Sequence, residues 1–87
     1  MSTGRTVLIT GGGSGLGAGL AGVFHTRGAR VEIAGRTASR LEAAATRYPG
    51  MGAEVVDVAD PDAVAALATR VARDRPDLDT VINSAGI

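Results

Sequence analysis

The chain of 87 residues contains no lysine and no cysteine, and its nine arginines balance nine acidic residues to a net charge of zero. The missing lysine excludes Schiff-base chemistry and a phosphate-loop lysine, and the missing cysteine excludes disulfides, a thiolate nucleophile and a cysteine zinc site. Because the balanced charge leaves no basic footprint and one histidine cannot build a metal site by itself, we expect neither nucleic acid nor a metal as a ligand.

The length and composition of the chain predict a single globular domain over residues 1–87. Apolar residues make up 45% of the chain, which is typical of a folded core. No apolar run approaches the roughly 18 residues of a membrane-spanning helix. The first ten residues lack the long apolar segment of a signal peptide. We therefore expect a cytoplasmic protein with no membrane partner.

The first predicted strand and the first predicted helix lie on either side of a glycine-rich segment. Val7–Ile9 is an apolar run rich in β-branched residues, which predicts a buried strand. From Gly15 onward, apolar residues recur at steps of three and four, which predicts a helix that stops at Gly28. The face that we expect to turn inward is formed by Leu16, Leu20, Val23, Phe24 and Arg27.

Two more strand–helix units follow, and a fourth strand comes last. The remaining strands are predicted at Val31–Ala34, Ala53–Val58 and Thr80–Ile82. The second helix is predicted over Ala38–Arg47, and the third begins behind Asp60, which caps it, and ends before Pro76. The inward residues that we expect on these two helices are Leu41, Ala44, Ala45 and Tyr48, then Val64, Leu67, Ala68 and Val71.

The resulting order of elements is β-α-β-α-β-α-β. Strands that are joined by single helices pair in parallel through right-handed crossovers. We therefore predict an α/β protein with a partial Rossmann, or doubly wound, fold that has four parallel strands and three helices.

Five glycines lie within the seven residues Gly11–Gly17, between the first strand and the first helix. A tight strand-to-helix turn favours positive φ angles, and a dinucleotide pyrophosphate must approach such a turn closely. The start of the helix offers free N–H groups to an anion, and Ser14 adds a hydroxyl donor. This pattern predicts nucleotide binding, with a flexible loop as the alternative. A methyltransferase that uses adenosylmethionine would place an acid where Gly35 and Arg36 stand, and a phosphate-loop nucleotidase would need a lysine.

Four motifs, in the right order, resemble those of the short-chain dehydrogenase/reductase family. Thr10-Gly11-x-x-x-Gly15-x-Gly17 is similar to the family's Thr-Gly-x-x-x-Gly-x-Gly cofactor motif. The other three motifs follow the second, third and fourth strands, and they are Gly35-Arg36-Thr37, Asp57-Val58 and Asn83-Ser84-Ala85-Gly86. The resemblance covers essentially the whole chain, and it implies an oxidoreductase that uses a nicotinamide dinucleotide.

The resemblance also implies a set of cofactor-binding residues. Asp57 would contact the adenine with Val58 beside it, although the alternative is that Asp57 only orders its own turn. Asn83 would tie the fourth strand to its neighbours, while Ser84 replaces the family's second asparagine and is left out of the set. The implied cofactor-binding residues are Thr10, Gly11, Gly13, Ser14, Gly15, Leu16, Gly17, Arg36, Thr37, Asp57, Val58, Asn83, Ala85 and Gly86.

Arg36 determines which dinucleotide we expect. Gly35 stands where NAD-selective relatives carry an acid for the ribose hydroxyls, so no carboxylate repels a 2′-phosphate there. Arg36 is then able to pair with that phosphate and to stack on the adenine. The alternative is a solvated surface arginine. We expect NADP in preference to NAD.

No catalytic residue is predicted in the chain. In the family, a lysine four residues after the catalytic tyrosine lowers the pKa of a phenol that is otherwise about 10, and a serine precedes the pair. Here Gly52 lies four residues after Tyr48, so we expect Tyr48 to pack and His25 to be structural.

Taken with the end of the chain at Ile87, this predicts a cofactor-binding fragment that is inactive alone and that pairs with itself or with a missing C-terminal half. The alternatives are a non-catalytic nucleotide-binding module and a non-functional truncated remnant.

Overall fold

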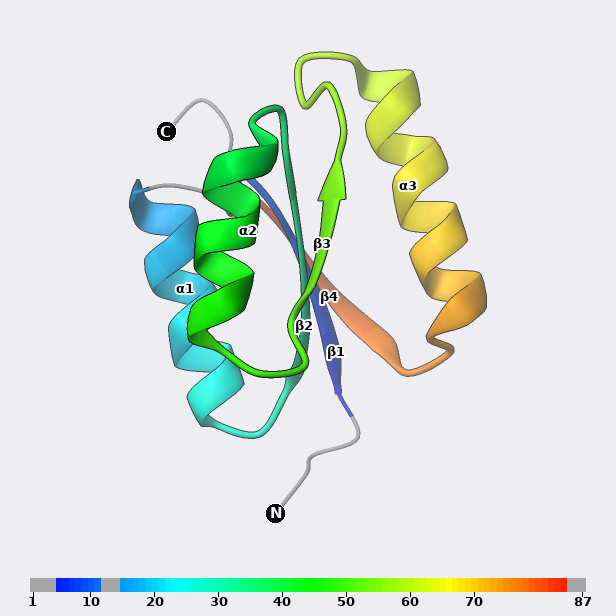
Figure 1. Cartoon of the computed structure of the whole chain (residues 1–87). Helices are drawn as coiled ribbons and strands as arrows, with labels where there is room; N and C mark the ends of the chain where they lie inside the picture. Colours follow the sequence, from blue (N-terminus) through cyan, green and yellow to red (C-terminus); the bar gives the residue numbers. More distant parts are fainter. Residues whose placement is uncertain (1–4, 12–14, 85–87) are drawn as a thin grey trace.

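The computed structural model of the chain describes residues 5–11 and 15–84, and within them one parallel sheet lies between two layers of helices (Figure 1). The sheet has four strands in the order β3-β2-β1-β4. Helices α1 and α2 cover one face of this sheet, and α3 covers the other. The elements are β1 (Thr6–Thr10), α1 (Gly15–Thr26), β2 (Arg30–Gly35), α2 (Ala38–Arg47), β3 (Gly52–Val55), α3 (Pro61–Asp74) and β4 (Leu78–Asn83).

Strand β1 is the centre of the molecule, since all five of its residues are buried between β2 and β4. Successive side chains of a strand point to opposite faces. Val7 and Ile9 therefore join the apolar cluster under α1 and α2, while Leu8 joins a second cluster under α3. The predicted doubly wound α/β arrangement of four parallel strands and three helices is confirmed.

Local signals set the ends of two helices as the sequence predicts. The side chain of Asp60 caps α3 by accepting hydrogen bonds from the backbone N–H groups of Asp62 at 3.0 Å and Ala63 at 3.4 Å. Helix α1 gives way to β2 at Gly28, whose φ of +89° is a conformation that glycine adopts freely. The predicted bounds of α2 are the observed ones.

Two expectations about the elements are corrected by the structure. On α1, Leu20 and Phe24 pack against the core as predicted, but Leu16 is 54% exposed and Val23 is 50% exposed. The most deeply buried residues of the helix are small, namely Gly17, Ala21 and Gly22. Gly17 lies against Gly11 and Ser84, and Gly22 lies against the ring of Tyr48.

The second error concerns β3, which ends at Val55 rather than at Val58. The backbone N–H of Val56 still donates to the carbonyl oxygen of Gly35 at 2.8 Å, but the chain then turns toward α3. None of the described helices has both the length and the apolar character needed to cross a membrane.

Candidate functional site

The carboxyl ends of the four strands meet at one edge of the sheet, where the three helices also begin (Figure 1). The chain passes from β1 outward through β2 to β3, and then returns to the other side of β1 as β4. Ligands of doubly wound sheets bind at such a reversal of strand order, beyond the carboxyl ends of the strands. The helix starts direct free N–H groups and positive dipole ends toward this edge, which suits an anion.

The glycine turn is packed tightly against this reversal point. The backbone N–H of Gly11 donates to the carbonyl oxygen of Ala34 at 2.6 Å, and the φ of Gly11 is +78°. A side chain at Gly17 would collide with the carbonyl oxygen of Gly11 and with the hydroxyl oxygen of Ser84. Gly17 is therefore required for α1 to start this close to β1 and β4. Of the predicted cofactor residues in the turn, Gly13 and Ser14 lie outside the described residues.

Thr10 joins β1 to β4 through its side chain and its backbone. Its buried hydroxyl donates to the side-chain oxygen of Asn83 at 2.9 Å. The carbonyl oxygen of Thr10 accepts hydrogen bonds from the backbone N–H of Ser84 at 3.1 Å and from the Ser84 hydroxyl at 2.8 Å. Asn83 thus ties β4 to its neighbour, as the resemblance implied.

Ser84 is a structural residue of the site that the sequence did not reveal. It is only 7% exposed, and its hydroxyl is turned inward, between Thr10 and the start of α1. The replacement of the family's second asparagine was the only signal in the sequence, and it did not indicate where the hydroxyl would bond. The predicted residues Ala85 and Gly86 lie outside the described residues.

Arg36 and Thr37 follow β2 at the same edge, and both are exposed. Within the described parts of the chain, no hydrogen bond or ion pair of the Arg36 side chain is found. Thr37 is the N-cap of α2, yet its side chain makes no capping hydrogen bond. Its carbonyl oxygen accepts from the N–H groups of Arg40 and Leu41 in the first turn. The start of α2 therefore presents a guanidinium and a hydroxyl to the surroundings.

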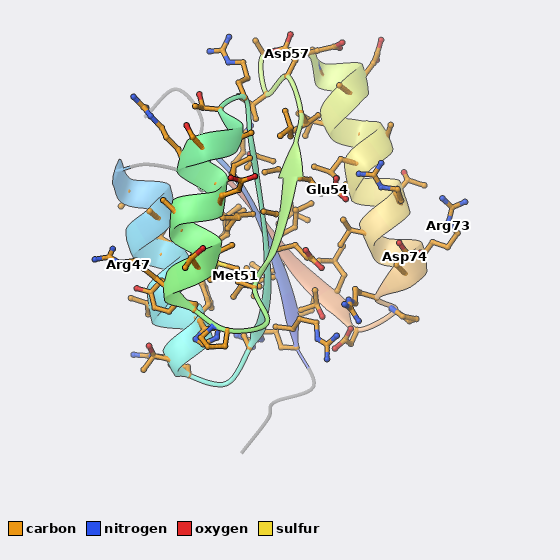
Figure 2. All side chains as sticks on the ribbon, in the orientation of Figure 1. Arg47, Met51, Glu54, Asp57, Arg73 and Asp74 are labelled. Atoms are coloured by element: carbon orange, nitrogen blue, oxygen red, sulfur yellow. The ribbon has the colours of Figure 1, made fainter. Side chains whose placement is uncertain are left out.

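Asp57 and Val58 lie between β3 and α3, and Figure 2 shows Asp57 at the carboxyl edge of the sheet near the start of α3. One carboxylate oxygen of Asp57 accepts from the backbone N–H of Ala59 at 3.0 Å, and its carbonyl oxygen accepts from that of Asp60 at 3.0 Å. Asp57 thus orders its own turn, and its contact with an adenine stays a prediction. The same turn leads into the cap of α3.

His25 and Tyr48 lie at the far end of α1 and α2, away from this edge. The His25 Nε2 atom is 3.0 Å from the carbonyl oxygen of Pro49, and the two aromatic rings are 5.1 Å apart. Tyr48 packs against the apolar cluster beneath α1 and α2. No group of three potential metal ligands occurs among the described residues.

Comparison with known proteins gives a consistent result. The family profile described as short chain dehydrogenase matches residues 5–87. Dehydrogenase/reductase SDR family member 7B of Bos taurus is 42% identical over 91 residues, covering 93% of this chain and 28% of that protein. D-threitol dehydrogenase of Mycolicibacterium smegmatis is 39% identical over 88 residues, covering 97% of this chain and 34% of that protein.

A solved structure extends the likeness to the fold. A metagenomic short-chain oxidoreductase in complex with NADP superimposes with a TM-score of 0.89 at 29% identity, covering 99% of this chain and 41% of that one. This chain spans about a third of the length of these two curated relatives.

Proposed function

Because this chain belongs to the short-chain dehydrogenase family, we propose that it forms the dinucleotide-binding part of an NADP-dependent oxidoreductase. The nicotinamide, when bound, supplies or accepts the hydride that interconverts a carbonyl and an alcohol. The residues of this chain bind and orient the cofactor. The chain accounts for the N-terminal region of its relatives, so the activity of the whole protein belongs to the proposal.

The close packing of Gly17 against Gly11 and Ser84 is the observation that carries the proposal. It brings the N-terminal turn of α1 to the place where strand order reverses, so that backbone N–H groups face a pyrophosphate. A helix that started farther away would leave this anion in water. The proposed phosphate-binding residues are Thr10, Gly11, Gly13, Ser14, Gly15, Leu16 and Gly17.

A preference for NADP rests on the start of α2. Arg36 and Thr37 are exposed there, and the hydroxyl of Thr37 is not used to cap the helix. A 2′-phosphate at this position would accept charge-assisted hydrogen bonds from the guanidinium and would lie at the positive end of the helix. The NADP complex of the metagenomic relative is in keeping with this choice.

The remaining proposed residues surround the rest of the cofactor. Asp57 and Val58 would border the adenine, because their turn follows β3 at the same edge as Arg36. Asn83 would hold the end of β4 in place through Thr10, and Ala85 and Gly86 would bring backbone close to the cofactor.

Proton transfer is assigned to no residue of this chain. The 87 residues contain no lysine, so the tyrosine–lysine pair of the family is not among them. Tyr48 packs between α1 and α2 at the end of the molecule opposite the site. The chain's proposed contribution to the reaction is therefore binding and orientation of the dinucleotide.

The open side of β4 supports a proposal about a protein partner. Strand β4 is at the edge of the described sheet, and its Val81 is 51% exposed on the face that α3 covers elsewhere. On the other face, α1 exposes Leu16 and Val23. An edge strand with apolar residues on both sides favours association. We propose that it pairs with the remaining two-thirds of the fold, and otherwise with a second copy of the chain.

Calorimetric titration of the folded chain with NADPH tests the proposed function, with circular dichroism to verify the fold. We expect saturable binding in the wild type and none in Gly17→Val, whose side chain would fill the contact with Gly11. A folded wild-type chain that binds no NADPH at millimolar cofactor would contradict the proposal.

A further inference from the structure

The peptide group between Thr10 and Gly11, where β1 enters the glycine turn, is held by hydrogen bonds on both of its sides. Its carbonyl oxygen accepts from the backbone N–H of Ser84 at 3.1 Å and from the Ser84 hydroxyl at 2.8 Å. Its N–H donates to the carbonyl oxygen of Ala34 at 2.6 Å. Because the C=O and N–H of a planar trans peptide point in opposite directions, this rigid group connects the end of β4 to the end of β2.

The orientation of this peptide group determines how the chain leaves β1. Gly11 follows it with a φ of +78°, a conformation that glycine adopts freely. The carbonyl oxygen of Gly11 then lies against Gly17, in the first turn of α1, so closely that a side chain there would collide with it. The place where α1 starts therefore follows from the orientation of the Thr10–Gly11 peptide.

Ser84 contacts this arrangement at two points. Its hydroxyl donates to the Thr10 carbonyl, and its hydroxyl oxygen would be 2.6 Å from the Cβ atom of a side chain at Gly17. Ser84 is buried, so its hydroxyl needs a partner inside the protein. One side chain thus lies between the end of β1, the end of β4 and the start of α1.

Asn83 also joins β4 to β1, but it does so one step before the turn. Its side-chain oxygen accepts from the Thr10 hydroxyl at 2.9 Å, and this hydroxyl also lies 3.5 Å from the carbonyl oxygen of Ile82. That bond connects side chains of two paired strands and leaves the orientation of the next peptide group unspecified. The hydroxyl of Ser84, by contrast, acts on the peptide group that leads into the turn.

We propose that Ser84 is a positioning residue for the pyrophosphate of the bound dinucleotide, a role that rests on the proposed function. Its hydroxyl is directed into the protein and acts through the Thr10 carbonyl and the start of α1. Backbone N–H groups at a helix start bind an anion best when they are held in place beforehand. Without the hydroxyl, the turn has more freedom, and part of the binding free energy is used to order it.

Ser84 and Arg36 then have separate effects on the cofactor. NADPH and NADH carry the same pyrophosphate, so loss of the Ser84 hydroxyl should weaken both by the same factor. Arg36 lies at the start of α2, and its proposed partner is the 2′-phosphate, which only NADPH carries. Ser84 therefore sets the affinity for the dinucleotides, whereas Arg36 sets the choice between them.

Titration of the full chain with three ligands tests this role. NADPH and NADH are titrated by calorimetry, and adenosine 2′-phosphate, which has no pyrophosphate, is titrated by NMR. We expect Ser84→Ala to weaken NADPH and NADH about three- to ten-fold each, by factors that agree within about two-fold. The affinity for adenosine 2′-phosphate should stay within about two-fold of the wild type.

Ala66→Gly is the matched control for a general loss of stability. Ala66 is exposed in the interior of α3, on the other face of the sheet from α1, and glycine there should destabilise the chain about as much as Ser84→Ala does. Denaturant unfolding verifies that the two variants match, and Ala66→Gly should bind all three ligands like the wild type. Hydrogen exchange of the Gly11 amide should be faster in ligand-free Ser84→Ala than in Ala66→Gly, because the peptide group is held less firmly.

The outcomes separate the role of Ser84 from the proposed function. Wild-type affinity for both dinucleotides in Ser84→Ala, a loss confined to NADPH, or an equal loss for adenosine 2′-phosphate would overturn the positioning role while the wild type still binds NADPH. Equal weakening of the dinucleotides in Ala66→Gly would also overturn it. A folded wild type that binds neither dinucleotide would contradict the proposed function itself, and the positioning role with it.

Discussion

The hydroxyl of Ser84 donates a 2.8 Å hydrogen bond to the carbonyl oxygen of Thr10, and this bond is buried where β1 and β4 end. The same hydroxyl lies where a side chain on Gly17 would need to be. One small polar residue therefore joins the two strands on either side of the reversal point and leaves space for the helix start. The geometry of the proposed cofactor site depends on that junction.

Removal of the Ser84 hydroxyl should weaken the junction without destroying it. We expect Ser84→Ala to lower the free energy of unfolding by about 1 kcal/mol, since the Thr10 carbonyl keeps its bond from the Ser84 backbone N–H. Denaturant unfolding measures this, and Ser39→Ala on exposed α2 is the control, expected within about 0.5 kcal/mol of wild type. Equal losses in the two variants would show that the buried bond contributes nothing.

Two glycines of α1 should respond in opposite directions to the same substitution. A methyl group at Gly17 would collide with Gly11 and Ser84, whereas at Gly19 nothing lies within 4 Å. We expect Gly17→Ala to cost about 1–3 kcal/mol of stability and Gly19→Ala to add about 0.5–1 kcal/mol. Thermal unfolding of the pair measures both, and a stabilised Gly17→Ala would be incompatible with the described turn.

Gly22 and Tyr48 should be energetically coupled. A side chain at Gly22 would meet the Tyr48 hydroxyl and would lie 2.9 Å from the Cζ atom of its ring. We expect Gly22→Ala to destabilise the wild type by about 1 kcal/mol more than it destabilises Tyr48→Leu, which lacks the ring. A double-mutant cycle from denaturant unfolding gives this difference, and purely additive effects would mean that the two residues do not compete for space.

Structural features that depend on residues close together in the sequence were predicted well. The bounds of α2 and the cap of α3 by Asp60 follow from local spacing and from hydrogen bonds to adjacent N–H groups. The inner side of α1 was predicted only in part, because apolar periodicity indicates large residues, whereas Gly17 must be small to fit against Gly11 and Ser84, and Gly22 to fit against Tyr48. Strand β3 ends early because its pairing partner β2 ends at Gly35, opposite Val55. The sequence of β3 itself carries no information about where β2 ends.

The site could be predicted only in part. Motif order placed Gly11, Gly17, Arg36 and Asn83 at one edge, because the carboxyl ends of parallel strands coincide. The inward bond of Ser84 and the ion pair of the half-buried Glu32 with Arg75 are contacts between segments far apart in the chain. Such contacts depend on the register of the strands and on how α3 packs across the sheet. No local sequence pattern specifies either of these.

Cofactor selectivity of Arg36→Ala tests the central claim most directly, namely that this edge binds NADP. Calorimetric titration of wild type, Arg36→Ala and the control Arg47→Ala, at the far end of α2, would use NADPH and NADH under the same conditions. We expect Arg36→Ala to weaken NADPH by about ten-fold or more, since a charge-assisted contact to the 2′-phosphate is lost, and to leave NADH within about two-fold. Arg47→Ala should change neither. Equal weakening of both cofactors in Arg36→Ala, or no effect on either, would contradict the claim.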